Sequence, residues 1–169
     1  VLDANIYTMN NRAEAFWMKK GILGDTVPLE LNAKELAHRN NKNSELTVYG
    51  YTPMMVSVQC VQKTMDHCNH ACVQYVLKDR YQKEFRGVCS CEFCYNTIYN
   101  TLPTSLLKEK EKAEKLGVKA YRLSFTTETQ QETEKIVRAF VDVYLRGQKP
   151  DGQMQTEETT KGHFQRGVE

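Results

Sequence analysis

The stretch "ELTVYG", Glu45–Gly50, decides how the chain is divided. Its alternation of apolar and polar residues predicts a β-strand, and Gly50 predicts where that strand ends. Just before it, Asn32 and Glu35 form a capping-box pattern that opens a helix ending near Asn40. After it the regular pattern stops, because residues 52–101 hold all six cysteines and no long helical period. We therefore interpret this stretch as an insertion.

The regular pattern outside the insertion alternates strands with helices. Such alternation indicates an α/β fold with parallel strands, and four βα units are half of an eightfold barrel. We expect a half-barrel-like segment over residues 1–147, part of a larger TIM-type barrel, with a cysteine-rich β-hairpin insertion at about 52–101 and a polar arm at 148–169. The other expected strands are Leu2–Tyr7, Val27–Leu31 and Ala120–Phe125; the other expected helices begin at Asn11 (with Glu14 completing a capping box), near Thr104 and near Thr129.

The bulk composition excludes some classes of partner. A net charge of +2 provides no global field that would attract nucleic acid or an anionic membrane. No apolar run approaches the ~18 residues that a membrane span needs, and the first residues have no signal-peptide pattern. We expect a cytoplasmic protein without a membrane partner. Because the chain begins with a strand-like pattern and no Met, we also expect it to pack with the remainder of a longer polypeptide.

The cysteines have the spacing Cys60-x7-Cys68-x3-Cys72 and Cys89-x1-Cys91-x2-Cys94. Disulfides are typical of small secreted domains, and six buried free thiols so close together would be an unusual accident of packing. The "CEFC" clip places two thiolates on one turn, which favours a metal site. Four thiolates suit both Zn²⁺ and an iron–sulfur cluster, and His67 or His70 could replace one of them, so these alternatives stay open.

Seven motifs resemble a known family in their order along the chain. The motifs are "LDANIYTMN", "VPLELN", "YGYTPMMVSVQC", "LKDRYQKEF", "CEFCYNTIYN", "YRLSFTTE" and "GHFQRGVE". They resemble the C-terminal part of long bacterial proteins of the collagenase-like peptidase family U-thirty-two. The resemblance implies a hydrolase, or one of the related factors that hydroxylate RNA or ubiquinone precursors without oxygen. Some of those relatives hold a 4Fe–4S cluster on four cysteines, and the motif match then implies Cys60, Cys68, Cys91 and Cys94 as ligands, with Cys72 and Cys89 outside the pattern.

Little in the sequence indicates catalysis by this segment alone. It contains no G-x-S-x-G, no H-E-x-x-H and no signature of a nucleophilic cysteine. The candidate catalytic residues are Glu30 and Glu128, which follow expected strands, and Arg122, which lies within one. Helix capping or surface ion pairs are the alternative for the two glutamates, and a structural ion pair is the favoured interpretation of Arg122.

The stretch "YVLKDRYQKEFRGV" predicts a β-hairpin that turns near Asp79–Gln82. Basic and aromatic residues alternate on it, as on surfaces that bind RNA phosphates and bases, although a solvated hairpin is the simpler interpretation. Two hypotheses follow for the chain. The first is the C-terminal region of a collagenase-like peptidase or RNA-hydroxylation factor carrying a four-cysteine zinc or 4Fe–4S site. The alternative is a non-catalytic, zinc-stabilised module that binds RNA or a protein partner.

Overall fold

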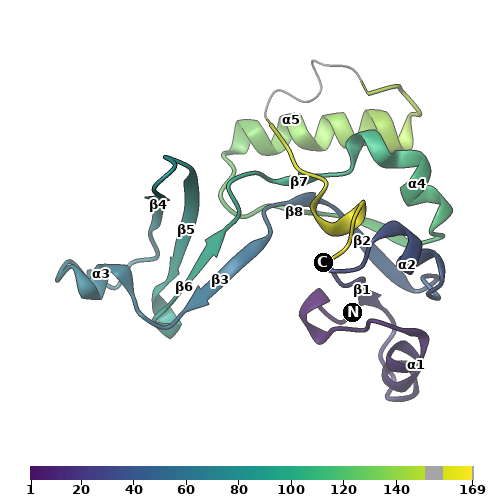
Figure 1. Cartoon of the computed structure of the whole chain (residues 1–169), viewed down its shortest axis with the longest axis horizontal. Coiled ribbons are helices and arrows are strands. Elements are labelled where there is room, and N and C mark those ends of the chain that lie inside the picture. The colour runs from purple at the N-terminus through teal and green to yellow at the C-terminus, as the bar shows by residue number, and fades with distance from the viewer. Residues whose placement is uncertain (151–157, 169) are drawn as a thin grey trace.

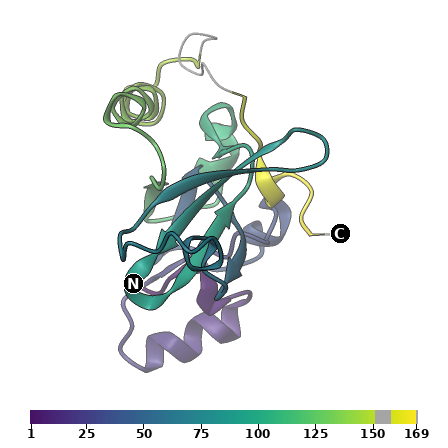
Figure 2. The same ribbon diagram turned by 90° about the vertical axis from the view of Figure 1, so that its left-hand side faces the viewer.

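The computed structural model describes residues 1–150 and 158–168. Within these residues the fold is mixed α/β, with two four-stranded sheets and five α-helices. Sheet A lies beside the helices, and sheet B projects away from them as an arm (Figure 1). Seen from the side of sheet B, α5 and α1 lie at opposite ends of the molecule (Figure 2). No helix in this part of the chain is long and apolar enough to cross a membrane.

Sheet A is built around β2 (Ser44–Gly50), the strand predicted from "ELTVYG". Strand β8 (Ala120–Ser124) runs parallel to it along one edge. The other edge pairs with β1 (Asp25–Thr26), which is parallel, and with β7 (Thr104–Ser105), which is antiparallel. Gly50 permits the close approach of β8, because a Cβ atom there would lie 2.7 Å from the carbonyl oxygen of Ser124.

The helices begin at side-chain caps that the sequence predicts well. Asn32 and Glu35 form the expected capping box of α2, and Thr129 and Glu132 form another at the start of α5. The first helix is capped by Asn10 instead of the expected Asn11. The α-helices are α1 (Asn11–Lys19), α2 (Ala33–Ala37), α3 (Val61–Thr64), α4 (Lys110–Lys115) and α5 (Gln130–Phe140), and a π-helical turn, Val141–Leu145, continues α5.

The main core lies between sheet A and the helices that cover it. Leu46 and Val48 of β2 are 4% and 1% exposed, and they belong to the same cluster as Phe140 of α5. Phe164, within the predicted arm 148–169, is also buried in this cluster, and the isolated bridge of Thr160 to Thr104 holds the same segment against β7. The described residues of the arm are therefore packed, whereas residues 151–157 and 169 lie outside the described part.

The predicted insertion is a complete antiparallel sheet, which is more than the hairpin expected. Sheet B has the order β3-β6-β5-β4. It leaves sheet A at the carboxyl end of β2, and its predicted hairpin is confirmed by the pairing of β4 with β5. The Asp79 carboxylate accepts hydrogen bonds from the backbone N–H groups of Tyr81 and Lys83, which closes the turn. The strands are β3 (Pro53–Ser57), β4 (Gln74–Lys78), β5 (Glu84–Ser90) and β6 (Tyr95–Tyr99).

Two of the four predicted sheet strands are wrong. Leu2 makes a single bridge to Asp25, after which Asp3 caps a 3₁₀ turn, Ala4–Ile6, so Leu2–Tyr7 is not a strand. Pairing of the next strand ends at Thr26, before the expected Val27–Leu31, because Pro28 has no N–H to donate. The helix expected from Thr104 begins later, since Thr104–Ser105 pairs with β2. In the described residues neither sheet closes into a barrel.

Candidate metal centre

All six cysteines are free thiols and lie around the turns that close the far end of sheet B. None of them forms a disulfide, which removes that interpretation of the spacing. The thiols come from three segments of chain: Cys60 caps α3, Cys68 and Cys72 lie in the loop from α3 to β4, and Cys89, Cys91 and Cys94 lie at the end of β5 and in the turn before β6.

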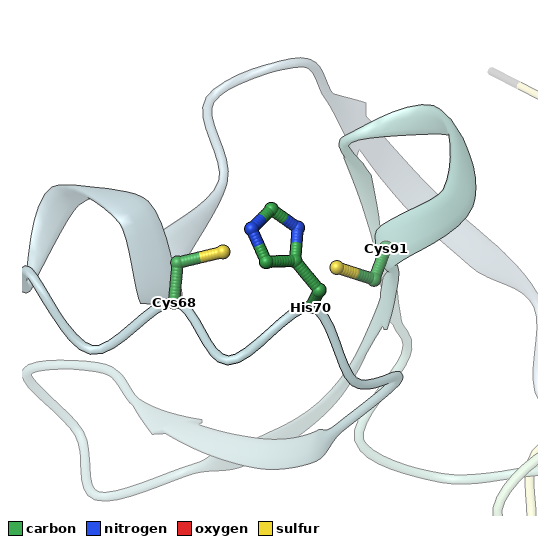
Figure 3. Close-up of side chains that lie close together, drawn as sticks. All are labelled: Cys68, His70 and Cys91. Carbon is green, nitrogen blue, oxygen red and sulfur yellow. The ribbon is translucent and has the colours of Figure 1, made fainter.

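Three potential ligands meet at one point. A sulfur of Cys68, a ring nitrogen of His70 and the sulfur of Cys91 all lie within 4.8 Å of one another. The imidazole ring lies between the two sulfurs, which both point toward it (Figure 3). Cys91 is only 9% exposed, whereas Cys68 and His70 are on the surface. The group therefore has one ligand on the buried turn and two on the loop that covers it.

The backbone around this group adopts unusual conformations. His70 and Cys94 have φ angles of 56° and 53°, in the left-handed region that few non-glycine residues occupy. The Cys94 N–H donates to the carbonyl oxygen of Cys91 at 3.3 Å, and the Cys94 sulfur lies 3.7 Å from the same oxygen. This tight turn, the 3₁₀ segment Cys91–Phe93, keeps the two thiols of the "CEFC" clip on one side of the loop.

A second pair of thiols lies beneath this group. The sulfur atoms of Cys60 and Cys89 are 3.6 Å apart, and both residues pack with Cys91 and the ring of Tyr75 in a small cluster separate from the main core. Burial and the neighbouring Cys60 thiol raise the pKa of Cys89 to about 11. Hydrogen bonding from the Lys63 backbone lowers the pKa of Cys60. Burial is also the main cause that raises the pKa of Cys91, with the Cys68 and Cys94 thiols adding to it.

The donor set suits a single metal ion. Ligand atoms held tetrahedrally at about 2.0–2.3 Å from one Zn²⁺ lie roughly 3.3–3.8 Å apart. The observed spread of up to 4.8 Å reaches that range with small side-chain rotations. Cys94 is the natural fourth ligand, because its thiol shares a turn with Cys91 and interacts with it electrostatically. Cys60, which was expected among the ligands, instead lies against Cys89, and its role as a ligand stays a prediction.

The sequence underrated His70. It was considered as a replacement ligand, with an exposed loop histidine as the simpler interpretation. The spacing "CNHAC" does carry a signal, since Cys68 and His70 are two residues apart on one short loop. What it lacks is the position of Cys91, which comes close only when β5 and β6 pair.

The candidate catalytic residues do not converge on the cysteines. Arg122 forms the structural ion pair that was favoured for it, with Glu45 on the neighbouring strand, and its side chain is 42% exposed instead of buried. Glu30 is half-buried in the turn that follows Pro28. Glu128 holds its own loop through the backbone N–H groups of Thr126 and Thr127, and it lines a cavity together with Tyr51.

Comparison with known proteins adds no relative. No family model, no curated protein and no solved structure matches this chain. The resemblance to the collagenase-like peptidase family therefore stays a prediction, and the function has to be argued from the site itself.

Proposed function

We propose that the end of sheet B is a zinc-binding module in which Cys68, His70, Cys91 and Cys94 hold one Zn²⁺. The observation that carries this proposal is the close approach of the Cys68, His70 and Cys91 ligand atoms. A Cys₃His set is a common structural zinc site, and the closed set leaves no open position for substrate. The ion would pin the loop between α3 and β4 onto the turn between β5 and β6. The module is thus non-catalytic.

The module would serve to present the β4–β5 hairpin to a partner, and we propose single-stranded RNA. Tyr81 at its tip is 68% exposed, and the guanidinium of Arg80 lies 4.7 Å from the centre of its ring. An exposed aromatic ring beside a guanidinium can stack on a base while the charge meets a phosphate. Lys78 is paired with Glu84 at 2.9 Å, so the tip carries more of this proposal than the strands do.

A second candidate rests on the four cysteines implied by the resemblance. In it Cys60, Cys68, Cys91 and Cys94 bind a 4Fe–4S cluster, and the chain is the C-terminal region of a collagenase-like peptidase or of an RNA-hydroxylation factor. The gathering of all six thiols at one end of sheet B supports it. The half-barrel and the TIM-type barrel of the parent polypeptide belong to this candidate. The presence of a histidine among the closest ligand atoms favours zinc.

Elemental analysis of the full chain purified without oxygen separates the two candidates. We expect colourless protein with about one zinc per chain. His70→Ala should lose the zinc, whereas Cys60→Ser should retain it. Brown protein with iron and sulfide, an absorbance near ~400 nm, and loss of that colour in Cys60→Ser but not in His70→Ala would support the cluster. Protein that binds neither metal would refute both.

A further inference from the structure

A cavity opens away from the cysteines, at the carboxyl ends of the parallel strands β2 and β8. Its empty volume is about 570 Å³, in the size range of small-molecule sites. Both sheets and α5 contribute to its walls, and the carboxyl ends of parallel strands are where ligands commonly bind. Its apolar wall includes Leu107, Ile136, Ala139 and Phe140.

Glu128 presents an unsatisfied carboxylate oxygen at this cavity. Its Oε2 accepts hydrogen bonds from the backbone N–H groups of Thr126 and Thr127, at 2.6 and 2.9 Å. Its Oε1 is buried, and no group in the described part of the chain donates a hydrogen bond to it. A buried acceptor without a donor is costly, so a ligand that brings an N–H donor would be bound favourably.

Arg86 of β5 supplies the opposite charge on the facing wall. Its guanidinium carbon lies 4.9 Å from the centre of the Tyr51 ring, and its Nη1 donates to the Thr127 hydroxyl at 3.2 Å. These contacts hold Arg86 beside the loop that carries Glu128. A guanidinium has five N–H donors in a planar fork that suits a carboxylate, and the bond to Thr127 uses one of them.

The charges around the cavity balance. Arg86 and Lys135 are basic, and Glu128 and Glu132 are acidic. A ligand with a single charge would satisfy one side of this arrangement and leave the other unpaired. A small zwitterion with an apolar body matches both the charges and the apolar wall.

We propose that this cavity binds a free α-amino acid with an apolar side chain. The ammonium group donates to Oε1 of Glu128, the carboxylate accepts from Arg86, and the side chain packs against Ile136 and Phe140. This site is independent of the metal, since its residues come from β2, β5, the loop after β8 and α5. It adds a ligand-binding role to that of the zinc module.

The test titrates the full chain with three matched ligands and follows backbone amide resonances by NMR. The ligands are L-phenylalanine, phenethylamine, which lacks the carboxylate, and hydrocinnamate, which lacks the amine. We expect saturable shifts at Tyr51, Thr127 and Glu128 with phenylalanine and at least tenfold weaker binding of the other two. Glu128→Gln and Arg86→Met should each weaken phenylalanine binding at least tenfold. Glu134→Gln, on the exposed part of α5 where Glu134 pairs with Arg138, is the matched control and should leave it unchanged.

Several results would overturn the proposal. One is the absence of saturable shifts at these amides with phenylalanine. Another is phenethylamine or hydrocinnamate binding as tightly as phenylalanine, which would mean that only one of the two charges is recognised. Equal effects of Glu128→Gln and Glu134→Gln would also refute it. If a variant loses its native spectrum, the three-ligand comparison on the unchanged chain still decides.

Discussion

Arg39 and Asp25 form an ion pair whose side chains are 2% and 0% exposed. The guanidinium also donates to the backbone oxygen of Thr8 at 2.8 Å and to the Ser44 hydroxyl at 2.9 Å. The Ser44 hydroxyl in turn donates to the second oxygen of Asp25, at 2.5 Å. This network joins the N-terminal segment, β1 and the start of β2, so it holds the edge of sheet A together.

Breaking this pair should destabilise the fold strongly. Replacing one partner leaves a buried charge uncompensated, so we expect Arg39→Met to lower the free energy of unfolding by about 3–5 kcal/mol. Urea denaturation measures this value. The matched control is Arg122→Met, which removes the arginine of the exposed Arg122–Glu45 pair and should cost at most about 1 kcal/mol. Similar losses in the two variants would show that the buried network adds nothing.

Removing the metal should loosen the arm and leave sheet A intact. The thiol cluster of Cys60, Cys89 and Cys91 is separate from the main core, so chelation should speed hydrogen–deuterium exchange in residues 60–72 and 91–94 only. Mass spectrometry with and without chelator measures the exchange. Cys91→Ser should mimic chelation, and Cys72→Ser, which alters an exposed thiol outside the proposed ligand set, should not. Faster exchange throughout β2 would contradict this independence.

The tip of the β4–β5 hairpin should contribute to RNA affinity. We expect Tyr81→Ala to weaken binding of single-stranded RNA by about 1–3 kcal/mol if its ring stacks on a base. Fluorescence anisotropy at fixed salt measures the affinity. Tyr7 is also exposed, at 52%, but lies in the N-terminal segment, so Tyr7→Ala is the control. Equal effects of the two substitutions, or no measurable RNA binding, would exclude this surface.

Glu109 should make stability depend on pH in the acidic range. Hydrogen bonds from Lys112 and from Lys161 lower the pKa of its carboxyl group from the ordinary 4.5. Because the folded pKa is below the unfolded one, the stabilisation is complete above pH 4.5 and is lost as the pH falls through the folded value. We expect Glu109→Gln to cost about 1 kcal/mol near neutral pH.

This cost should disappear in acid, where the wild-type carboxyl group is also neutral. Denaturation curves of both proteins from about pH 7 to about pH 3 measure the difference. Glu111→Gln, on the same helix, provides the comparison. A Glu109→Gln penalty that stays constant over this range would assign the effect to packing instead of charge.

Elements with strong local signals were predictable from the sequence. β2, β8, α5 and the β4–β5 hairpin lie within a residue or two of their expected places. Their periodicity, their caps and the Asp79 turn act over a few neighbouring residues, which is information that a single sequence contains. The clustering of the cysteines on the inserted stretch was visible in the same way.

Tertiary structure decided the rest, because it depends on which distant segments meet. Leu2–Tyr7 has a strand-like pattern, but Asp3 caps its own turn and the segment pairs at one residue only. Arg39 reaches Asp25 through the packing of α2 against β1, and Cys91 reaches His70 through the pairing of β5 with β6. Arg86 and Glu128 share a cavity because sheet B leaves β2 at the end where β8 also stops. Each of these contacts is made by side chains whose burial and charge are balanced only in the assembled fold, so no local pattern records them.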